Sequence, residues 1–498
     1  MPRLNHQMIL YIMGMLLLCN AGFMILAAGV GGYYEDGSTV PLVTASFITL
    51  IAGGILMGLN RGRYGQLKKR DGYVIVTFGW IVMTLSGTLP YVLSGTIPDF
   101  TNAFFETMSG YSTTGASILN NIEVLPQGIL FWRSLTHWIG GMGIIVLAIA
   151  ILPLLGIGGM QLFVAEAPGV NTDKLKPRIT DTAKRLWYIY VGLTIAQALL
   201  LQFAGMGLFD AVNHALSTMA SGGFSTKNQS VSYWNDNPMI QYIIIFFMFL
   251  AGTNFVLLYH VFKGNLKKVW GNLEFRWYSW FTIFFALLVG WVVYFRADLS
   301  LSSLNHPMVY GELESAFRHG LFQVVAVITT TGFTTADYEL WPPFLMVLIF
   351  GLFFLGGSSG STAGGVKVMR HVILIRNSVM EFKRALHPNA VLPVRYNGKA
   401  IGNEIVFTVL GFFILYMLSF IIGAVVLGMM GVDMATAIGG SAASLGNVGP
   451  AFGNLGPIDS FDVLPSGAKW WMSFLMLIGR LELFTVLILF TPFFWRTR

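Results

Sequence analysis

Four short polar segments centred on glycine recur along this chain, and their residue types suit the binding of a dehydrated cation. A cation that leaves water needs oxygen ligands in place of its hydration shell, and backbone carbonyls supply them without adding net charge. Glycine permits the backbone angles that aim successive carbonyls to one side, and it lets several loops approach one axis. The segments predict one ion-selectivity filter, with potassium bound at backbone carbonyls. They are Thr113-Thr114-Gly115, Ser221-Gly222-Gly223, Thr330-Thr331-Gly332 and Asn447-Val448-Gly449.

The spacing of these four triplets indicates an internal repeat. Their last glycines, at positions 115, 223, 332 and 449, are separated by 108, 109 and 117 residues. A near-constant period of this size indicates four copies of one structural unit. We expect each unit to contain an outward-going helix, a short descending helix, the glycine-centred loop and a second full helix. The short helices are expected near 99–112, 208–220, 312–329 and 433–445.

The short helices are expected to direct partial negative charge at the filter. Three of them carry an aspartate at or near the start, namely Asp99, Asp210 and Asp433. An aspartate there can cap free N–H groups and favours the positive end of the helix dipole. The opposite, C-terminal end of each helix would then point toward the filter, where its partial negative charge suits a cation.

The composition places these units in a membrane. Hydrophobic residues make up 55% of the 498 residues and charged residues 11%, and the mean hydropathy is +0.68. Apolar runs of about 20 residues are long enough to cross ~30 Å of hydrocarbon. We predict an all-α polytopic membrane protein with ten spanning segments, near 7–29, 41–60, 72–94, 129–152, 186–206, 238–262, 275–296, 343–370, 401–428 and 469–491.

These segments divide into a hairpin and four repeats. The expected units are a two-helix hairpin at 1–70, then repeats at 71–160, 175–270, 271–385 and 400–498, the third with a broken second helix. The only cysteine, Cys19, lies in the hairpin, which excludes an intramolecular disulfide and a cysteine-based metal site.

The net charge of +7 is best explained by membrane topology. Lysine and arginine concentrate in 61–70, 174–185, 263–276 and 367–399 and near both termini, which share one face if ten segments alternate. The positive-inside rule makes that face cytoplasmic, so we expect both termini there and no nucleic-acid binding. The opposite face is mildly acidic and would concentrate cations. Its acidic residues are Glu35, Asp36, Asp99, Asp236, Asp337, Glu339, Asp459 and Asp462.

The chain resembles the Trk/Ktr/HKT superfamily of cation transporters over essentially its whole length. The resemblance is carried by the four triplets, by His137-Trp138-Ile139-Gly140-Gly141-Met142-Gly143 and by Leu445-Gly446-Asn447-Val448-Gly449-Pro450. It implies four M1–P–M2 repeats around a central pore, in which M1 and M2 are the two full helices and P is the short helix with its loop. It also implies a homodimer surrounded by the lipids of the bacterial inner membrane. Its implied partner is a cytosolic TrkA-type regulatory ring that binds NAD(H) or ATP/ADP. It also implies that glycine in all four triplets favours potassium, whereas serine in the first marks sodium-preferring relatives. Gly115 therefore favours potassium, the transported substrate, and no organic cofactor is expected on this chain.

A glycine-rich segment interrupts the eighth predicted span. Each glycine costs a helix about 1 kcal/mol relative to alanine, and a broken helix at membrane depth survives only where it packs in protein or lines a water-filled cavity. In the resembling family the matching loop is taken as an intramembrane gate, and the alternative is a permanently kinked helix. The segment is no phosphate-binding loop, because Lys367 follows Gly365 one place late. It consists of Gly356-Gly357-Ser358-Ser359-Gly360-Ser361-Thr362-Ala363-Gly364-Gly365.

Arg480 lies near the middle of the last predicted span, where a charge is expensive and should face a cavity or a partner. Facing the pore, it would raise the electrostatic barrier to cations and limit leak. The resemblance gives it a counterpart, the pore arginine of the fourth repeat. The alternative is an internal salt bridge to a buried carboxylate, and Arg480 could also pair with the glycine-rich segment when the pore is shut.

The residues predict a gated, channel-like potassium uptake pore driven by the membrane potential. One alternative is a proton- or sodium-coupled symporter working by alternating access, which would need ionisable carriers at the membrane midplane, where carboxylates are scarce. A second is a membrane enzyme or scaffold, which would need a catalytic cluster or a sizeable exposed domain. The longest inner linker, at about 371–400, holds neither, so no enzyme is expected.

Overall fold

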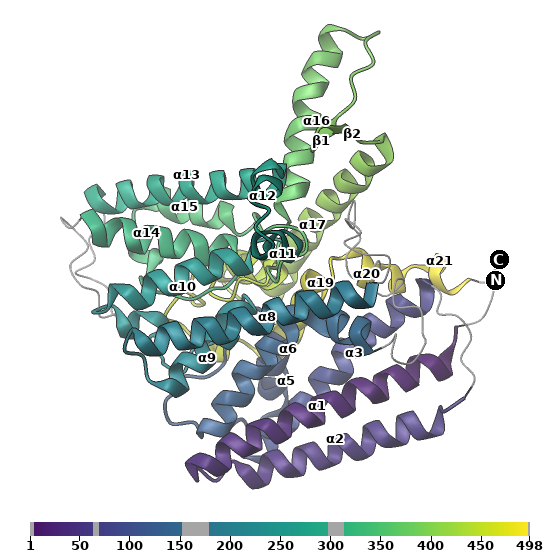
Figure 1. Cartoon of the computed structure of the whole chain (residues 1–498), viewed down its shortest axis with the longest axis vertical. Helices are drawn as coiled ribbons and strands as arrows, with labels where there is room; N and C mark the ends of the chain where they lie inside the picture. The colour runs from purple at the N-terminus through teal and green to yellow at the C-terminus, as the bar shows by residue number, and fades with distance from the viewer. Residues whose placement is uncertain (1–3, 63–68, 152–178, 297–312, 497–498) are drawn as a thin grey trace.

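The computed structural model describes residues 4–62, 69–151, 179–296 and 313–496. The end of the first predicted repeat, at 152–160, and parts of the basic runs at 61–70 and 174–185 lie outside these residues. Helices dominate the described chain (Figure 1). The elements are α1 His6–Tyr34, α2 Thr39–Leu59, α3 Lys69–Gly87, α4 Leu89–Leu93, α5 Phe100–Tyr111, α6 Gln127–Ile151, α8 Ile179–Phe203, α9 Leu208–Met219, η2 Ser230–Trp234, α10 Pro238–Ala251, α11 Phe255–Phe262, α12 Leu266–Gly271, α13 Leu273–Arg296, α14 Leu313–Ile328, η4 Tyr338–Leu340, α15 Pro343–Leu352, α16 Val368–Leu386, β1 Arg395–Tyr396, β2 Lys399–Ala400, α17 Asn403–Met429, α18 Met434–Gly446, η5 Phe461–Val463, α19 Ser466–Arg480, α20 Phe484–Leu487, η6 Ile488–Phe490 and α21 Pro492–Trp495.

The short helices α5, α9, α14 and α18 lie where the sequence predicts them. Asp99 caps α5, because its carboxylate accepts from the N–H of Asn102 at 2.8 Å, and Asp433 caps α18 through the N–H of Thr436 at 3.1 Å. Asp210 does not cap α9; it lies in the first turn, and its carboxylate accepts from the hydroxyl of Thr226 at 2.6 Å. Two of the three aspartates therefore act as N-caps.

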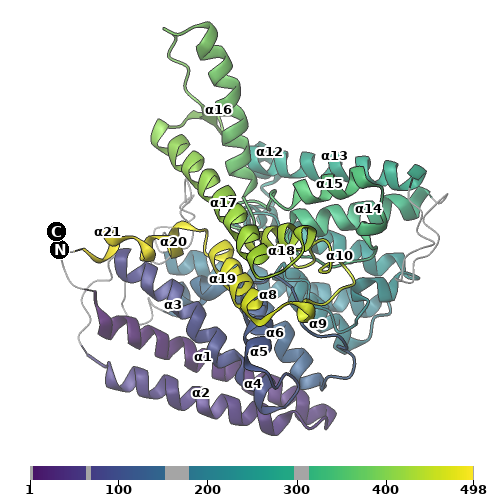
Figure 2. The same ribbon diagram turned by 180° about the vertical axis from the view of Figure 1, so that it is seen from behind.

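The repeats are arranged in a ring. The second long helix of one repeat packs against the short helix of the next, as α6 does with α9 and α10 does with α14. The fourth repeat closes back on the first, because α19 packs against α5 (Figure 2). The hairpin of α1 and α2 packs outside this ring, along α3 and α6 (Figure 1).

Among the described residues, six helices are long and apolar enough to cross a membrane, or eight spans when two bent pairs are included. Those pairs are α10 with α11, bent by 109°, and α19 with α20, bent by 110°. Helix α6 is kinked at Gly143, where φ is 66°, and α15 is followed by non-helical chain up to α16. The sequence led us to expect an interruption only in the eighth segment. The structure interrupts the second helix of every repeat.

Helix α16 and the hairpin of β1 and β2 project from the rest of the molecule together with the start of α17 (Figure 1). The two strands pair antiparallel, with Arg395 opposite Ala400 and Tyr396 opposite Lys399. The turn between them is Asn397-Gly398, and both residues have positive φ, 48° and 79°. Asn-Gly favours this two-residue hairpin turn, because both positions need a left-handed backbone.

Candidate functional site

Each short helix ends in the same backbone motif, and the motif begins the triplet that follows. The first residue of every triplet is left-handed although none is glycine: φ is 54° at Thr113, 58° at Ser221, 53° at Thr330 and 54° at Asn447. Its N–H bonds the carbonyl three residues back, and the next N–H bonds the carbonyl five residues back, at 2.8–3.3 Å in all four repeats. This is the Schellman arrangement that terminates helices. A left-handed L-residue costs about 1–2 kcal/mol, so its recurrence marks a shared structural demand.

The four triplets form a closed ring. Each glycine also has positive φ, between 70° and 96°. A Cβ added to Gly115 would lie 2.1 Å from the carbonyl oxygen of Gly222. A Cβ added to Gly223 would lie 2.0 Å from the carbonyl oxygen of Thr331. One added to Gly332 would lie 2.0 Å from the carbonyl oxygen of Val448, and one added to Gly449 would lie 2.6 Å from that of Thr114. The glycine of each triplet thus abuts the middle carbonyl of the next, and the fourth returns to the first.

Three of the four ring glycines are partly exposed, whereas Gly449 and the polar side chains of the ring are buried. Gly115, Gly223 and Gly332 are partly exposed, whereas Thr113, Thr330 and Asn447 are fully buried. The amide of Asn447 donates to the hydroxyl of Thr114 at 3.0 Å and to the carbonyl of Met476 at 2.9 Å, so a side chain also joins the fourth triplet to the first. All twelve residues predicted to bind the ion are brought together.

The glycine-rich segment, residues 356–365, lies against this ring. The N–H of Gly364 donates to the hydroxyl of Thr330 at 2.6 Å, and the hydroxyls of Thr362 and Ser221 are 2.9 Å apart. The segment also bonds the break between α10 and α11, because the N–H of Ser358 donates to the carbonyl of Gly252 at 2.8 Å. It therefore contacts the second and third triplets and the interruption in the second repeat.

Arg480 joins the glycine-rich segment to the first repeat. Its guanidinium donates to the carbonyl of Thr362 at 2.8 Å, to that of Gly141 at 2.9 Å and to that of Gly140. Its neighbour Glu482 forms an ion pair with Arg370 at the start of α16. The contact that the sequence suggested between Arg480 and the glycine-rich segment is therefore made, through a backbone carbonyl.

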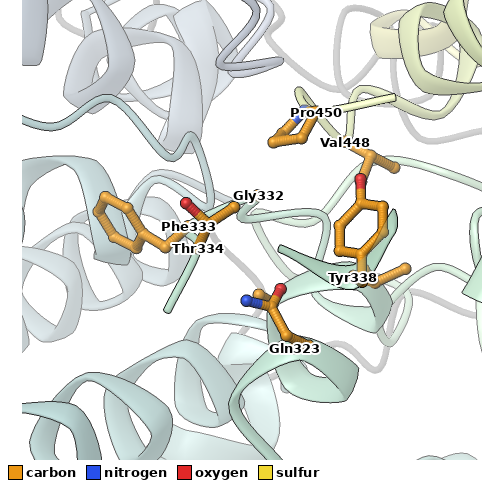
Figure 3. A pocket seen from close by; sticks show the side chains of 9 residues that line it. Gln323, Gly332, Phe333, Thr334, Tyr338, Val448 and Pro450 are labelled. Atoms are coloured by element: carbon orange, nitrogen blue, oxygen red, sulfur yellow. The ribbon is translucent and has the colours of Figure 1, made fainter. Parts of the chain in front are cut away.

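A narrow crevice opens behind the ring, between the third and fourth triplets (Figure 3). Gln323, Gly332, Val448 and Pro450 line it. Tyr338 also faces it and donates its hydroxyl to the carbonyl of Ala451 at 2.8 Å, which links the third repeat to the fourth.

Sequence reasoning missed three buried ionisable groups beside the site, Glu106, Arg133 and Glu274. All three are less than 5% exposed. The available signal was a charge inside an otherwise apolar helical segment, which is expensive in a membrane and usually functional.

Comparison with known proteins gives one consistent answer. The sequence model of TrkH, described as a cation transport protein, matches residues 39–497. The Trk system potassium uptake protein TrkH of Salmonella typhimurium is 42% identical over 499 residues, covering 99% of this chain and all of that protein. The TrkH protein of Escherichia coli K12 is 41% identical, with the same coverage. The crystal structure of the potassium transporter TrkH from Vibrio parahaemolyticus matches with a TM-score of 0.86 and 39% identity, over 99% of this chain and all of that one. The chain belongs to the TrkH family of cation transport proteins.

Membership of the TrkH family, together with the long apolar helices, makes this chain an integral membrane protein.

Three carboxylates of the predicted outer face lie close together in loops that follow the third and fourth triplets. Asp337 accepts from the N–H of Glu339 at 3.0 Å, Glu339 from that of Gly453 at 2.7 Å, and Asp459 from that of Gly456 at 3.1 Å. Burial raises the pKa of Glu339 to about 7, the charges of Asp337 and Asp459 add to the shift, and the Gly453 N–H opposes it.

With these three carboxylates on the predicted outer face, we expect cation uptake to depend on external pH. Glu339 is protonated below its pKa of about 7 and ionised above it, so raising the pH from about 6 to about 8 adds a negative charge. At low ionic strength and subsaturating cation, we expect uptake to rise about twofold over this range. The measurement is initial uptake against pH, with Glu339→Gln as the variant that should flatten the profile.

Folding stability should change with pH in the opposite sense to cation uptake. Folded Glu339 keeps a proton that the unfolded chain loses above its ordinary pKa of 4.5, so folding stability falls as the pH rises from 4.5 to about 7. Relative to the native protein, Glu339→Gln should be more stable at about pH 8 than at about pH 5. A Glu339→Gln variant that keeps the native pH profile of uptake would contradict this assignment.

Proposed function

We propose that this chain is a potassium uptake protein whose four triplets form the selectivity filter of a gated, channel-like pore. The observation that carries the proposal is the closed ring, in which the backbone of every triplet abuts the next with no room for a side chain. Four loops around one axis can surround a single dehydrated ion with backbone oxygens. The short helices α5, α9, α14 and α18 end at these loops, so their partial negative ends favour a cation.

The membrane potential is sufficient to drive uptake through such a pore. An inside-negative potential of 100 mV supplies ~2.3 kcal/mol per charge, which corresponds to about fortyfold accumulation of a monovalent cation. The relatives named as Trk potassium uptake proteins support potassium as the substrate. Gly115 in the first triplet agrees with that choice.

The glycine-rich segment and Arg480 are proposed to form the gate. The segment bonds the second and third triplets through Thr362 and Gly364, so its position and the ion path are coupled. Arg480 holds Thr362 to the first repeat through backbone carbonyls. In this conformation the hydrogen bonds of the guanidinium hold the segment against the ring, and opening of the gate requires that these bonds break.

Regulation is proposed to reach the gate from the cytosolic face through the projecting hairpin. The side chain of Asn397, in the turn between β1 and β2, accepts from the first N–H of α13, on Leu273. The next residue, Glu274, accepts from the N–H groups of Ser359 and Met369, at 2.6 and 3.2 Å. A cytosolic TrkA-type ring that moved this hairpin would therefore act on the gate across two side chains. Its nucleotide, NAD(H) or ATP/ADP, would bind on the ring.

A homodimer in the inner membrane, with cytoplasmic termini, completes the proposal. Helix α16 carries an exposed apolar stripe at the spacing of a helix-packing seam. Its members are Ile375, Val379, Phe382 and Leu386, exposed by 42, 46, 76 and 77%. The stripe supports helix packing between two copies in the projecting part of the molecule.

The test is potassium and sodium flux into proteoliposomes that contain the purified chain, with and without its cytosolic regulatory subunit. Downhill potassium flux that exceeds sodium flux and needs only a membrane potential would support the pore. Flux that requires an accompanying proton or sodium gradient would support the symporter instead. No cation flux from folded protein with the regulatory subunit present would refute the proposal.

A further inference from the structure

A buried ion pair lies behind the ring, between the first and second triplets. Glu106 is on α5 and Arg133 is on α6, and the Arg133 Nε and Glu106 Oε1 atoms are 2.7 Å apart. Glu106 is 0% exposed and Arg133 is 2% exposed. Burying both charges costs free energy, which is recovered only with good geometry and further hydrogen bonds. The partners of each group therefore show what the pair holds in place.

The glutamate holds the first loop. Its Oε1 accepts from the hydroxyl of Ser117 at 3.0 Å, and its Oε2 accepts from the N–H of Ile118 at 2.9 Å. Ser117 and Ile118 lie two and three positions after Gly115, whereas Glu106 precedes the triplet on the short helix. The carboxylate therefore ties the chain leaving the first triplet to the helix that enters it.

The arginine holds the second loop. Its Nη1 atom donates to the carbonyl of Ser225 at 2.9 Å, and the guanidinium carbon lies 3.5 Å from the centre of the Phe224 ring. Phe224 and Ser225 follow Gly223 directly. Phe224 is also stacked on His137, with ring centres 3.9 Å apart, so its ring is held between two groups of α6. The ion pair consequently connects the exit of the first triplet to the exit of the second.

The same position is used in the next two repeats. Glu106, His214 and Gln323 are separated by 108 and 109 residues, which is the spacing of the triplet glycines. His214 Nε2 lies 2.9 Å from the hydroxyl of Ser225, and its ring lies 5.5 Å from that of Phe333, in the next loop.

Gln323 repeats the pattern in the third repeat. It donates to the carbonyl of Ala336 at 3.2 Å and lines the crevice together with Pro450 of the fourth loop (Figure 3). A polar strut thus runs from the short helix to its own loop and toward the next loop in three repeats. Only the strut of the first repeat is an ion pair.

We propose that Glu106 and Arg133 are positioning residues that set the separation of the first and second triplets and thereby the ion preference of the ring. The inference rests on the filter function proposed above. Ion preference depends on the number, spacing and mobility of the coordinating carbonyls. A short, fully buried ion pair with both partners hydrogen-bonded to loop backbone restricts that spacing more firmly than a neutral strut. Neither group touches the ion; each acts through the loop it holds.

The decisive variant is Glu106→Gln, which keeps the side-chain shape and removes the ion pair. We expect the ratio of potassium to sodium flux to fall about tenfold while potassium flux persists, because the loops remain but their spacing relaxes. The matched control is Glu314→Gln, which removes the ion pair with Arg318 within α14, where Glu314 is 57% exposed and joins no two loops. That control should keep the native ratio.

A second variant separates positioning from simple damage by an unpaired charge. Glu106→Gln combined with Arg133→Met removes both charges and fills the space with an apolar chain of similar length. We expect its folding stability to recover relative to the single variant while its flux ratio stays low. A readout independent of transport is the thermal stabilisation of the detergent-purified chain by potassium relative to sodium, since an ion that binds only the folded state raises its stability. This difference should shrink in both variants.

The outcomes distinguish the inference from the function on which it rests. A native flux ratio in Glu106→Gln, or full recovery of the ratio in the double variant, would overturn the positioning role alone. Absence of potassium flux and of potassium-specific stabilisation in the native chain, with its regulatory subunit present, would overturn the filter itself and this inference with it. Low ratios in both variants beside a native ratio in Glu314→Gln would establish the role.

Discussion

Replacing Gly115 by alanine is expected to reduce potassium transport on the order of a hundredfold, because the ring has no space for a methyl group there. The added Cβ would lie 2.1 Å from the carbonyl oxygen of Gly222, closer than such atoms approach in proteins. The residue would also be held at a φ of 84°, which costs an L-residue about 1–2 kcal/mol. The first and second triplets must separate to accommodate the methyl group, so the carbonyls of the proposed filter would no longer replace the hydration shell together.

The matched control is Gly37→Ala, in the turn between α1 and α2. Gly37 has a φ of 81°, so alanine meets the same backbone strain, but no atom lies within 4 Å of the added Cβ. Both variants should lose similar intrinsic backbone stability, and only Gly115→Ala should lose transport. The measurement is initial potassium flux into proteoliposomes, normalised to folded protein by size-exclusion chromatography. Equal flux in the two variants would contradict the ring as the ion path.

Much of the repeat organisation could be predicted because it is encoded locally. A triplet that begins with threonine, serine or asparagine and ends with glycine recurs every 108–117 residues, and it locates each loop without any knowledge of its neighbours. The short helices were predicted to within a few residues for the same reason. Their starts carry aspartates such as Asp99 and Asp433, and their ends are set by the triplets themselves.

The helix interruptions show where local patterns are insufficient. In the third repeat, the break in the second helix is marked by a glycine-rich sequence. In the fourth repeat, the second helix bends by 110° at Glu482 and Leu483, which both have positive φ although neither is glycine. Such a backbone persists only when the surrounding structure holds it. Here the carboxylate of Glu482 is held by Arg370, 112 residues away in the sequence. No local pattern marks a break that depends on so distant a partner.

The buried ion pair of Glu106 and Arg133 behind the ring was missed for a related reason. Glu106 and Arg133 are separated by 27 residues, and Arg133 and Ser225 by 92, so their contacts exist only after the repeats have closed. Aligning the chain with itself at the triplet period would have placed Glu106, His214 and Gln323 at one position. The residues at this position thus recur with the same period as the triplets, although their residue types differ.

Replacing Arg480 by alanine is expected to raise potassium leak through the pore about tenfold when the regulatory subunit is absent. The side chain donates charged hydrogen bonds to the carbonyls of Thr362 and Gly141, and such bonds contribute about 1.5–3 kcal/mol each. Their loss releases the glycine-rich segment from the first repeat. Removing a positive charge beside the proposed ion path would also lower the electrostatic barrier to a cation. Both effects act in the same direction.

Arg480→Lys separates the two contributions, because lysine keeps the charge but lacks the planar fork that reaches two repeats at once. If the guanidinium hydrogen bonds are the main restraint on leak, the lysine variant should leak nearly as much as the alanine variant. If the positive charge is the main restraint, the lysine variant should resemble the native chain. The measurement is potassium flux at a fixed membrane potential, with and without the regulatory subunit. Native or reduced leak in folded Arg480→Ala would show that this arginine does not restrain the pore. The contact between Arg480 and Thr362 would then be a structural brace between the first and third repeats.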